Sequence, residues 1–200
     1  ISTVNSTMKL HDFIATLTSL NDEDTTALRY YFDNNPDYHV VRNNGVQKFT
    51  EMNLNQYEPE LAMFFGRKIK KLVERYQDLH SPTGDRFFPE VYGLEEFRIK
   101  RYNEHECFKQ HVDVGDLNSS RRFLAFLFYL NDDFEGGGTL FRTPDPKYIK
   151  PKTGDVLIFP PTWQYPHEGM EVTKGTKYIM STYLHYVDSP SRTHNPTGTN

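Results

Sequence analysis

The segment Phe108-Lys109-Gln110-His111-Val112-Asp113 places a histidine and an aspartate two residues apart within a predicted strand. Side chains at positions i and i+2 of a β-strand point to the same face of the sheet. We therefore expect His111 and Asp113 to direct an imidazole and a carboxylate toward one point. Because a single HxD pair is common by chance, its meaning depends on the rest of the chain.

Short strands are also predicted on both sides of this segment. Turn-forming clusters, notably residues 131–138 and 151–154, separate them. The predicted strands are 96–102, 108–113, 122–130, 138–142, 155–159 and 178–186. Many short strands after a helical beginning predict an α+β protein whose core is an antiparallel sandwich or barrel.

The first 80 or so residues are predicted to be mainly helical, with some extended pieces. A short helix is expected over residues 25–33, and a longer one from Pro59, which suits a first helical turn, to about residue 79. Apolar residues form one stripe of the longer helix, and basic residues lie mostly on its other side. This basic face is most simply a solvated one, with an anionic partner as the alternative.

The composition sets limits on the class of protein. A chain of 200 residues with a formal net charge of −4 suits one domain and disfavours a nucleic-acid partner. Its single cysteine, Cys107, excludes an intramolecular disulfide and a CxxC site. No apolar run approaches the ~18–20 residues that a membrane span needs. We expect a cytoplasmic protein without a membrane partner, and since the chain begins at Ile1 rather than Met, this expectation leaves room for an upstream leader.

A second histidine gives the HxD pair a chemical meaning. His167 lies 56 residues after His111 and follows the predicted strand 155–159. Two histidines and one carboxylate form the facial triad of non-heme Fe(II) oxygenases, which leaves metal positions open for substrate and O2. A zinc site would more often complete a tetrahedron with a further ligand or a water. His111, Asp113 and His167 are therefore our candidate metal ligands and catalytic residues.

Lys177 lies ten residues after His167, beside a glycine turn. If residues 178–186 form a strand, Lys177, Ser181 and Tyr183 share one of its faces. A lysine with a hydroxyl on the same face suits the distal carboxylate of an organic acid inside a barrel. The alternative is a surface lysine at a turn.

Landmarks between Arg101 and Tyr186, under half of the chain, occur in a characteristic order. They are Arg101-Tyr102, Phe108-Lys109-Gln110-His111-Val112-Asp113, Phe128-Tyr129-Leu130-Asn131, Gly136-Gly137-Gly138-Thr139-Leu140-Phe141, Lys150-Pro151-Lys152-Thr153-Gly154-Asp155, Phe159-Pro160, Pro166-His167-Glu168 and Gly175-Thr176-Lys177-Tyr178. Each piece alone is weak, but their order and spacing together are specific. The chain resembles the 2-oxoglutarate- and Fe(II)-dependent dioxygenases, in particular the prolyl 4-hydroxylase-like branch that includes hypoxia-type prolyl hydroxylases.

The resemblance implies a double-stranded β-helix, or jelly-roll, with supporting helices packed outside it. It implies Fe(II), the cosubstrates 2-oxoglutarate and O2, and ascorbate as a candidate reductant. Lys177 matches the residue that pairs with the distal carboxylate of 2-oxoglutarate. Tyr129, Tyr102 and Ser181 match cosubstrate-binding positions in relatives, although Tyr129 fits an ordinary core position equally well.

The expected domain organisation follows from the same resemblance. Residues 1–200 form a single domain. Residues 1–95 supply helical support and a lid, with 80–94 as the candidate lid over a bound peptide. Residues 96–188 form the double-stranded β-helix core, and residues 189–200 form a flexible tail.

The implied reaction is hydroxylation of a C–H bond coupled to decarboxylation of 2-oxoglutarate, with formation of succinate and CO2. The carboxylate of Asp113 favours hydroxylation over halogenation, since related halogenases carry a small residue there. The resemblance suggests C4 of a peptidyl proline as the site of hydroxylation. The alternatives are another protein side chain, a small molecule or an alkylated nucleobase, and a module without turnover. Arg122 is a candidate substrate contact at the barrel mouth, or else a solvated charge at a strand end.

One departure from the family pattern lies just before the HxD pair. Relatives often have glycine where this chain has His105, Glu106 and Cys107. Since the triad is complete without His105, we expect that residue at the surface or the mouth. His185, near the end of the last predicted strand, is expected to be structural or exposed.

Overall fold

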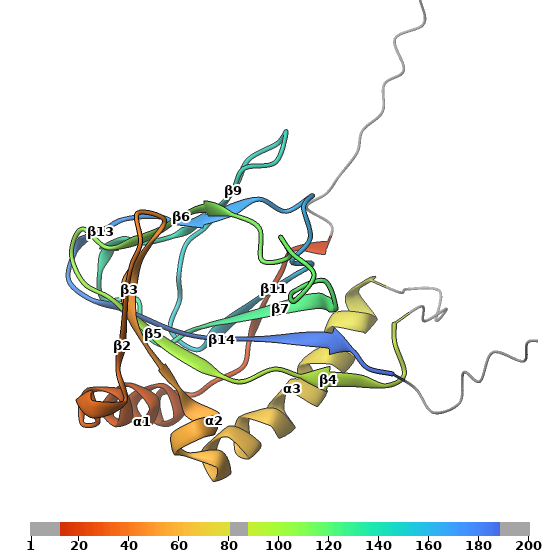
Figure 1. The fold of residues 1–200 in the computed structure, drawn as a ribbon, viewed down its shortest axis with the longest axis horizontal. Coiled ribbons are helices and arrows are strands. Elements are labelled where there is room, and N and C mark those ends of the chain that lie inside the picture. The colour runs from red at the N-terminus through yellow and green to blue at the C-terminus, as the bar shows by residue number, and fades with distance from the viewer. Residues whose placement is uncertain (1–12, 81–87, 189–200) are drawn as a thin grey trace, which may run out of the picture.

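The computed structural model describes residues 13–80 and 88–188, which form a curled β-sheet with a few helices against one face (Figure 1). The helices are α1 (Asp22–Asp33), the 3-10 helix η2 (Pro36–Tyr38), α2 (Leu54–Tyr57) and α3 (Pro59–His80). The strands are β1 (Ala15–Thr18), β2 (Val40–Asn43), β3 (Gln47–Asn53), β4 (Tyr92–Leu94), β5 (Arg98–Tyr102), β6 (Cys107–His111), β7 (Arg122–Tyr129), β8 (Glu135–Gly136), β9 (Thr139–Phe141), β10 (Lys147–Ile149), β11 (Asp155–Phe159), β12 (His167–Gly169), β13 (Val172–Lys174) and β14 (Lys177–Tyr186).

The strands follow the order β1-β11-β7-β14-β5-β3-β6-β12-β9-β10, with β2 added to β3 and β4 added to β14. Strands β13 and β8 form a separate pair, and the pairing is antiparallel. In Figure 1 the layer with β6 and β9 faces the layer with β7, β11 and β14, and the helices cover the outer side of the latter. This arrangement confirms the α+β class and is consistent with a jelly-roll core.

Alternation along the strands divides the core into two apolar clusters. On β7, Leu124, Phe126 and Phe128 belong to an outer cluster that also holds residues of α1 and α3. The intervening Ala125 and Tyr129 belong to an inner cluster between the two layers of strands. The period of two therefore lets one strand hold the helices on one face and line the interior with the other.

Both predicted helices are present, with small differences at their ends. Helix α1 begins at Asp22, three residues before the prediction, because a capping box stabilises that end. The Asn21 side chain accepts a hydrogen bond from the backbone N–H of Asp24 at 2.7 Å. Helix α3 buries the predicted apolar stripe, including Phe65, Ile69 and Val73, against the outer cluster.

The early part of the chain contributes more to the sheet than its helical pattern indicated. Strand β1 forms the edge next to β11, and β3 lies between β5 and β6 in the sheet order. Of the predicted lid, residues 81–87 lie outside the described residues, while β4 pairs with β14. The predicted tail over 189–200 also lies outside them. Within the described chain, no helix is long and apolar enough to cross a membrane.

Candidate metal centre and cosubstrate pocket

Strand pairing brings the two candidate histidines together. His111 is the last residue of β6, His167 is the first residue of β12, and the two residues face each other in the antiparallel register. Their ring centroids are 4.4 Å apart. Residues that are 56 positions apart in sequence thus become neighbours through the pairing of β6 with β12.

The prediction of one strand through Asp113 is wrong in its last two residues, because β6 ends at His111. The chain leaves the sheet there, and the backbone N–H of Val114 donates to the carbonyl of Pro161 at 3.1 Å rather than to a neighbouring strand. Asp113 nevertheless reaches the histidines, with its Oδ1 atom 3.5 Å from His111 Nε2 and its Oδ2 atom 3.7 Å from His167 Nε2.

Hydrogen bonds to the far side of each imidazole fix which ring nitrogen faces Asp113. His111 Nδ1 lies 2.8 Å from the carbonyl oxygen of Lys109, and His167 Nδ1 lies 3.0 Å from that of Tyr165. A carbonyl only accepts hydrogen bonds, so each Nδ1 carries the proton and each Nε2 keeps its lone pair. This orientation is the one that metal-binding histidines adopt.

The donor set fits a metal ion. The ligand atoms of His111, Asp113 and His167 all lie within 4.8 Å of one another. The Nε2–carboxylate distances are too long for hydrogen bonds, so the three groups converge without satisfying one another. Two imidazole nitrogens and one carboxylate form the set that non-heme Fe(II) uses.

The electrostatics of the cluster favour the ligating protonation states. Burial alone would raise the pKa of Asp113, but His167, His111 and the hydroxyl of Tyr183 outweigh it and lower that pKa to about 2. Burial lowers the pKa of His167, against the attraction of Asp113. A metal requires an ionised carboxylate and neutral imidazoles, so these shifts favour its binding.

The triad opens onto a small inner cavity of about 50 Å³ between the two layers of strands. Tyr102, Thr139 and Ser181 are among the residues that line it, together with the three triad residues. Two of the predicted cosubstrate contacts, Tyr102 and Ser181, therefore face the same space as the metal ligands.

The sequence model of the 2OG-Fe(II) oxygenase superfamily matches residues 97–185, which contain this whole site. Residues 97–185 of the chain are therefore similar to the 2OG-Fe(II) oxygenase superfamily. Oxygenases of this superfamily use Fe(II), 2-oxoglutarate and O2, and the triad could hold the iron. This match, together with the prolyl hydroxylase relatives described next, confirms the resemblance to prolyl 4-hydroxylase-like oxygenases.

Proteins similar to this chain include prolyl and lysyl hydroxylases. A protein of Acanthamoeba polyphaga mimivirus that is named as a prolyl 4-hydroxylase is 33% identical over 110 residues, which are 46% of this chain and 45% of that protein. Procollagen-lysine,2-oxoglutarate 5-dioxygenase 1 of Mus musculus is 26% identical over 125 residues, 60% of this chain and 16% of that one. The chain thus spans less than half the length of the curated relatives that it matches.

Solved structures share the fold. A Pseudomonas putida prolyl-4-hydroxylase superposes with a TM-score of 0.68 at 14% identity, covering 88% of this chain and 94% of that one. The viral collagen prolyl hydroxylase of Paramecium Bursaria Chlorella virus-1, in its 2OG complex, gives a TM-score of 0.64 at 20% identity, covering 88% and 97%. These likenesses confirm the jelly-roll architecture of the chain.

Lys177 lies inside the fold, which excludes the alternative of a surface lysine at a turn. Its side chain is only 2% exposed, and Nζ donates to the carbonyl of Gly137 at 2.6 Å. Gly137 has a positive φ of 63°, and a Cβ there would lie 2.7 Å from the ring of Phe134, so the position requires glycine. Burial, followed by the charge of Lys100, lowers the pKa of Lys177 to about 7.

Tyr129 does not line the inner cavity, but it forms a hydrogen bond with a residue that does. Its ring is completely buried in the inner cluster, and its hydroxyl lies 2.9 Å from Thr139 Oγ1. Thr139 itself lines the cavity. Tyr129 is therefore a core residue, and its hydroxyl orients the side chain of Thr139, which faces the site.

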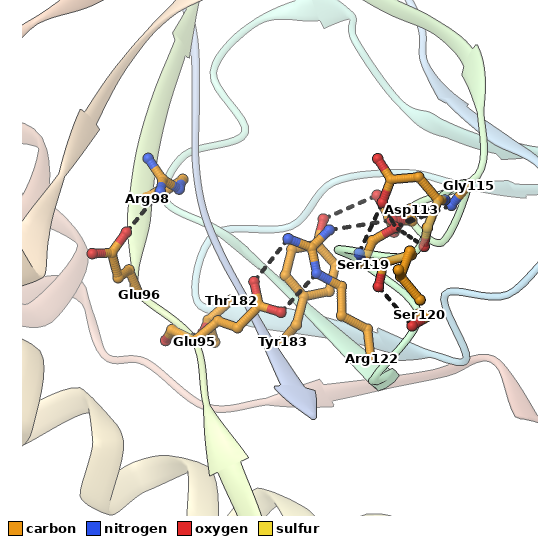
Figure 2. A network of polar contacts seen from close by, with 12 residues as sticks. Glu95, Glu96, Arg98, Asp113, Gly115, Ser119, Ser120, Arg122, Thr182 and Tyr183 are labelled. Carbon is orange, nitrogen blue, oxygen red and sulfur yellow. Dashed lines mark hydrogen bonds and ion pairs between the residues drawn. The ribbon is translucent and has the colours of Figure 1, made fainter. Parts of the chain in front are cut away.

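Arg122 lies in the wall of a larger outer cavity of about 510 Å³ and is not simply a solvated charge. It donates from Nε and Nη2 to Glu95 at 2.7 and 2.8 Å, and from Nη1 to the backbone carbonyl of Asp113 at 3.2 Å (Figure 2). Its guanidinium also covers the ring of Tyr183 at 4.1 Å. These contacts make Arg122 a support for the metal centre, while its contact with substrate stays a prediction.

Sequence reasoning placed Tyr183 on the correct face but gave it no role. The Tyr183 hydroxyl donates to Asp113 Oδ1 at 2.9 Å, and burial together with Asp113 raises its pKa well above the usual value (Figure 2). Such a bond fixes the orientation of a ligating carboxylate. The signal was the alternation along β14, because Tyr183 follows Ser181 by two residues.

The two other histidines near the motifs lie where the sequence placed them. The side chain of His105 is 73% exposed and pairs with Glu171 at 2.9 Å. His185 packs at Gly93 on the paired strand β4. Neither histidine lines the inner or the outer cavity.

Proposed function

We propose that this chain hydroxylates C4 of a peptidyl proline in an Fe(II)- and 2-oxoglutarate-dependent reaction. The carrying observation is the His111, Asp113 and His167 cluster, which borders a small inner cavity and, through His111 and Asp113, a larger outer one. The names of the mimivirus relative and of the similar structures support proline as the substrate residue.

The reaction balances as a four-electron reduction of O2. One oxygen atom enters the substrate as a hydroxyl group, and the other enters the succinate formed when 2-oxoglutarate loses CO2. The C–H bond and the 2-oxo acid each supply two electrons. Bound Fe(II) supplies the redox chemistry that couples these two oxidations.

The residues of the chain hold the metal and the cosubstrate and exclude water from the site. His111, Asp113 and His167 hold the metal, and Tyr183 holds the Asp113 carboxylate by its hydrogen bond. Lys177 lines neither cavity but is buried behind Tyr102, whose ring its Nζ atom faces at 5.1 Å, and from there its charged ammonium group would hold the distal carboxylate of 2-oxoglutarate. The apolar walls of the inner cluster exclude water from the reacting atoms.

The outer cavity is the place for the substrate. It is lined by residues of β5, β6, β7 and β14, and its volume of about 510 Å³ is sufficient for a side chain with its flanking peptide. His111 and Asp113 line both cavities, so a residue inserted from outside reaches the metal centre directly.

A second candidate substrate is a peptidyl lysine. The name of the mouse relative, a procollagen-lysine 5-dioxygenase, favours it. Against it stands Lys100, a cation in the wall of the outer cavity that forms no ion pair within the described residues. A substrate ammonium group near this lysine would be repelled.

The test is succinate formation with Fe(II), 2-oxoglutarate and ascorbate, with and without a proline peptide. We expect the peptide to stimulate succinate and to gain the mass of one oxygen atom from O2 on proline, at C4 by comparison with hydroxyproline standards. The matched control replaces that proline by alanine. Stimulation by a lysine peptide alone would overturn proline as the substrate and favour the second candidate.

A further inference from the structure

Lys100 occupies the junction between the two cavities. Six residues line both of them: Lys100, Phe108, His111, Asp113, Ser181 and Tyr183. Lys100 lies on β5 two residues before Tyr102, so its side chain shares the interior face with that tyrosine, while Ile99 turns to the outer cluster.

No carboxylate in the described part of the chain forms an ion pair with Lys100. Glu51 faces it across the β3–β5 ladder but accepts its hydrogen bonds from another strand. The carboxylates of the outer cavity are also engaged, as Figure 2 shows for Glu95 and Glu96. The observed pairs are Glu51–Arg42, Glu95–Arg122 and Glu96–Arg98.

Asp113 is the remaining acidic neighbour, and the metal centre already uses it. Its two oxygens face His111 and His167, and one accepts from Tyr183. Lys100 is therefore a half-buried ammonium group beside the triad that Glu51 and Asp113 attract without forming an ion pair, and its Nζ atom lies 5.4 Å from the centre of the Phe49 ring. Removing a charge from water without a partner costs stability, so a ligand that supplies an anion there is favoured.

We propose that Lys100 binds a carboxylate of the substrate next to the hydroxylated residue. This inference rests on the proposed function, because it assigns a chemical class to the substrate of that same site. The carboxylate belongs either to an acidic side chain that flanks the proline or to a main-chain terminus beside it. Lys177 then binds the distal carboxylate of 2-oxoglutarate inside the fold, and Lys100 binds the carboxylate of the substrate at the outer cavity.

The test compares peptides that differ only in charge. One amidated proline peptide carries asparagine at each flanking position in turn, a second set carries aspartate, and a third ends in a free carboxylate directly after proline, with free L-proline as its shortest form. Binding is measured by calorimetry without O2, in the presence of Fe(II) and 2-oxoglutarate, so that no turnover is needed. We expect at least one carboxylate-bearing probe to bind about tenfold more tightly than its uncharged counterpart.

Variants then assign this preference to Lys100. Lys100→Met keeps the length of the side chain and should abolish the preference, while Lys100→Arg should retain most of it. The matched control is Lys48→Met, on the neighbouring strand β3, whose exposed side chain lines neither cavity. Lys100→Met should not weaken the binding of 2-oxoglutarate.

Three outcomes would overturn the proposal. Wild-type protein could bind none of the carboxylate-bearing probes more tightly than the uncharged peptide, a comparison that needs no variant. The preference could persist in Lys100→Met. Lys100→Met could instead weaken 2-oxoglutarate and leave peptide binding unchanged, which would move Lys100 to the cosubstrate. Hydroxylation of neutral proline peptides with any of these results would leave the proposed function standing.

Discussion

Two lysines on adjacent strands mark the two ends of the same site. Lys177 opens β14, Lys100 lies on β5, and these strands pair with Lys177 opposite Tyr102 and Ile179 opposite Lys100. Lys177 is sealed inside, with the Gly137 carbonyl as its partner, whereas Lys100 is half-buried at the cavity junction. The comparison thus sets one residue type in two different surroundings, for which we propose two different ligands.

The two lysines also influence each other. Burial lowers the pKa of both, and the charge of Lys100 is the second cause for Lys177. An anion bound at either end reduces this repulsion. If the two lysines bind the proposed ligands, cosubstrate and substrate should each make the binding of the other more favourable.

Removing a metal ligand gives the largest expected effect. Neither the cosubstrate at Lys177 nor the substrate at Lys100 can react without a metal bound at the triad. His111→Ala and Asp113→Ala should reduce Fe(II)-dependent succinate formation to background, while the melting temperature changes little. The readouts are succinate by mass spectrometry and thermal unfolding by circular dichroism. His105→Ala, an exposed histidine of the same chain, should keep full activity. Normal turnover in either triad variant would refute the metal assignment.

Lys177→Ala tests whether Lys177 binds 2-oxoglutarate. Truncating one partner of a buried charge pair costs about 2–5 kcal/mol, so the apparent affinity for 2-oxoglutarate should fall from about 30-fold to several thousand-fold. Peptide binding in the absence of O2 should change far less. The KM for 2-oxoglutarate, measured beside that of Lys100→Met, checks the division of roles. An unchanged KM in Lys177→Ala would place the anchor on another residue.

The sequence predicted one of these lysines and missed the other for a physical reason. Lys177 follows His167 at a characteristic spacing, so its position could be inferred before any strand was placed. Lys100 stands in an Arg98-Ile99-Lys100-Arg101 run that resembles an exposed strand. The alternation with Tyr102 did contain the signal, because two residues of separation put both on one face.

The fold shows the same division between local and non-local information. Helix α3 and six of the fourteen described strands, β5, β6, β7, β9, β11 and β14, could be predicted because apolar periodicity and turn residues are local signals. The position of β3 between β5 and β6 could not, since it depends on pairing with residues about 50 positions away. The end of β6 at His111 was missed for the same reason, because the contact of Val114 with Pro161 diverts the chain.

Tyr183→Phe probes the region between the two lysines. The hydroxyl orients Asp113, so its loss should weaken metal binding by about 10–100-fold, the usual effect of an outer-shell partner. Fe(II) affinity is measured by the metal dependence of succinate formation. Tyr186→Phe, at the exposed end of the same strand, is the matched control. A Tyr183→Phe enzyme that needs no additional iron would show that Arg122 and the backbone suffice to hold Asp113.

The smallest expected effect is the pH dependence of 2-oxoglutarate binding. Burial and the charge of Lys100 lower the pKa of Lys177 to about 7, so in the free protein this lysine is charged below that pH and neutral above it. A bound carboxylate favours the charged form and raises the pKa. Affinity should therefore fall as pH rises, by about tenfold between about pH 6 and about pH 8. Calorimetry with Fe(II) and without O2 measures it.

Two variants connect this profile to the comparison of the lysines. Lys177→Arg stays charged over the whole range, so its affinity should be independent of pH there. Lys100→Met removes the repelling charge, which raises the pKa of Lys177 and moves the decline in affinity to higher pH. A decline that persists in Lys177→Arg would assign the titration to another group. A profile that Lys100→Met leaves in place would show that burial alone sets the pKa, and that the two ends of the site act independently.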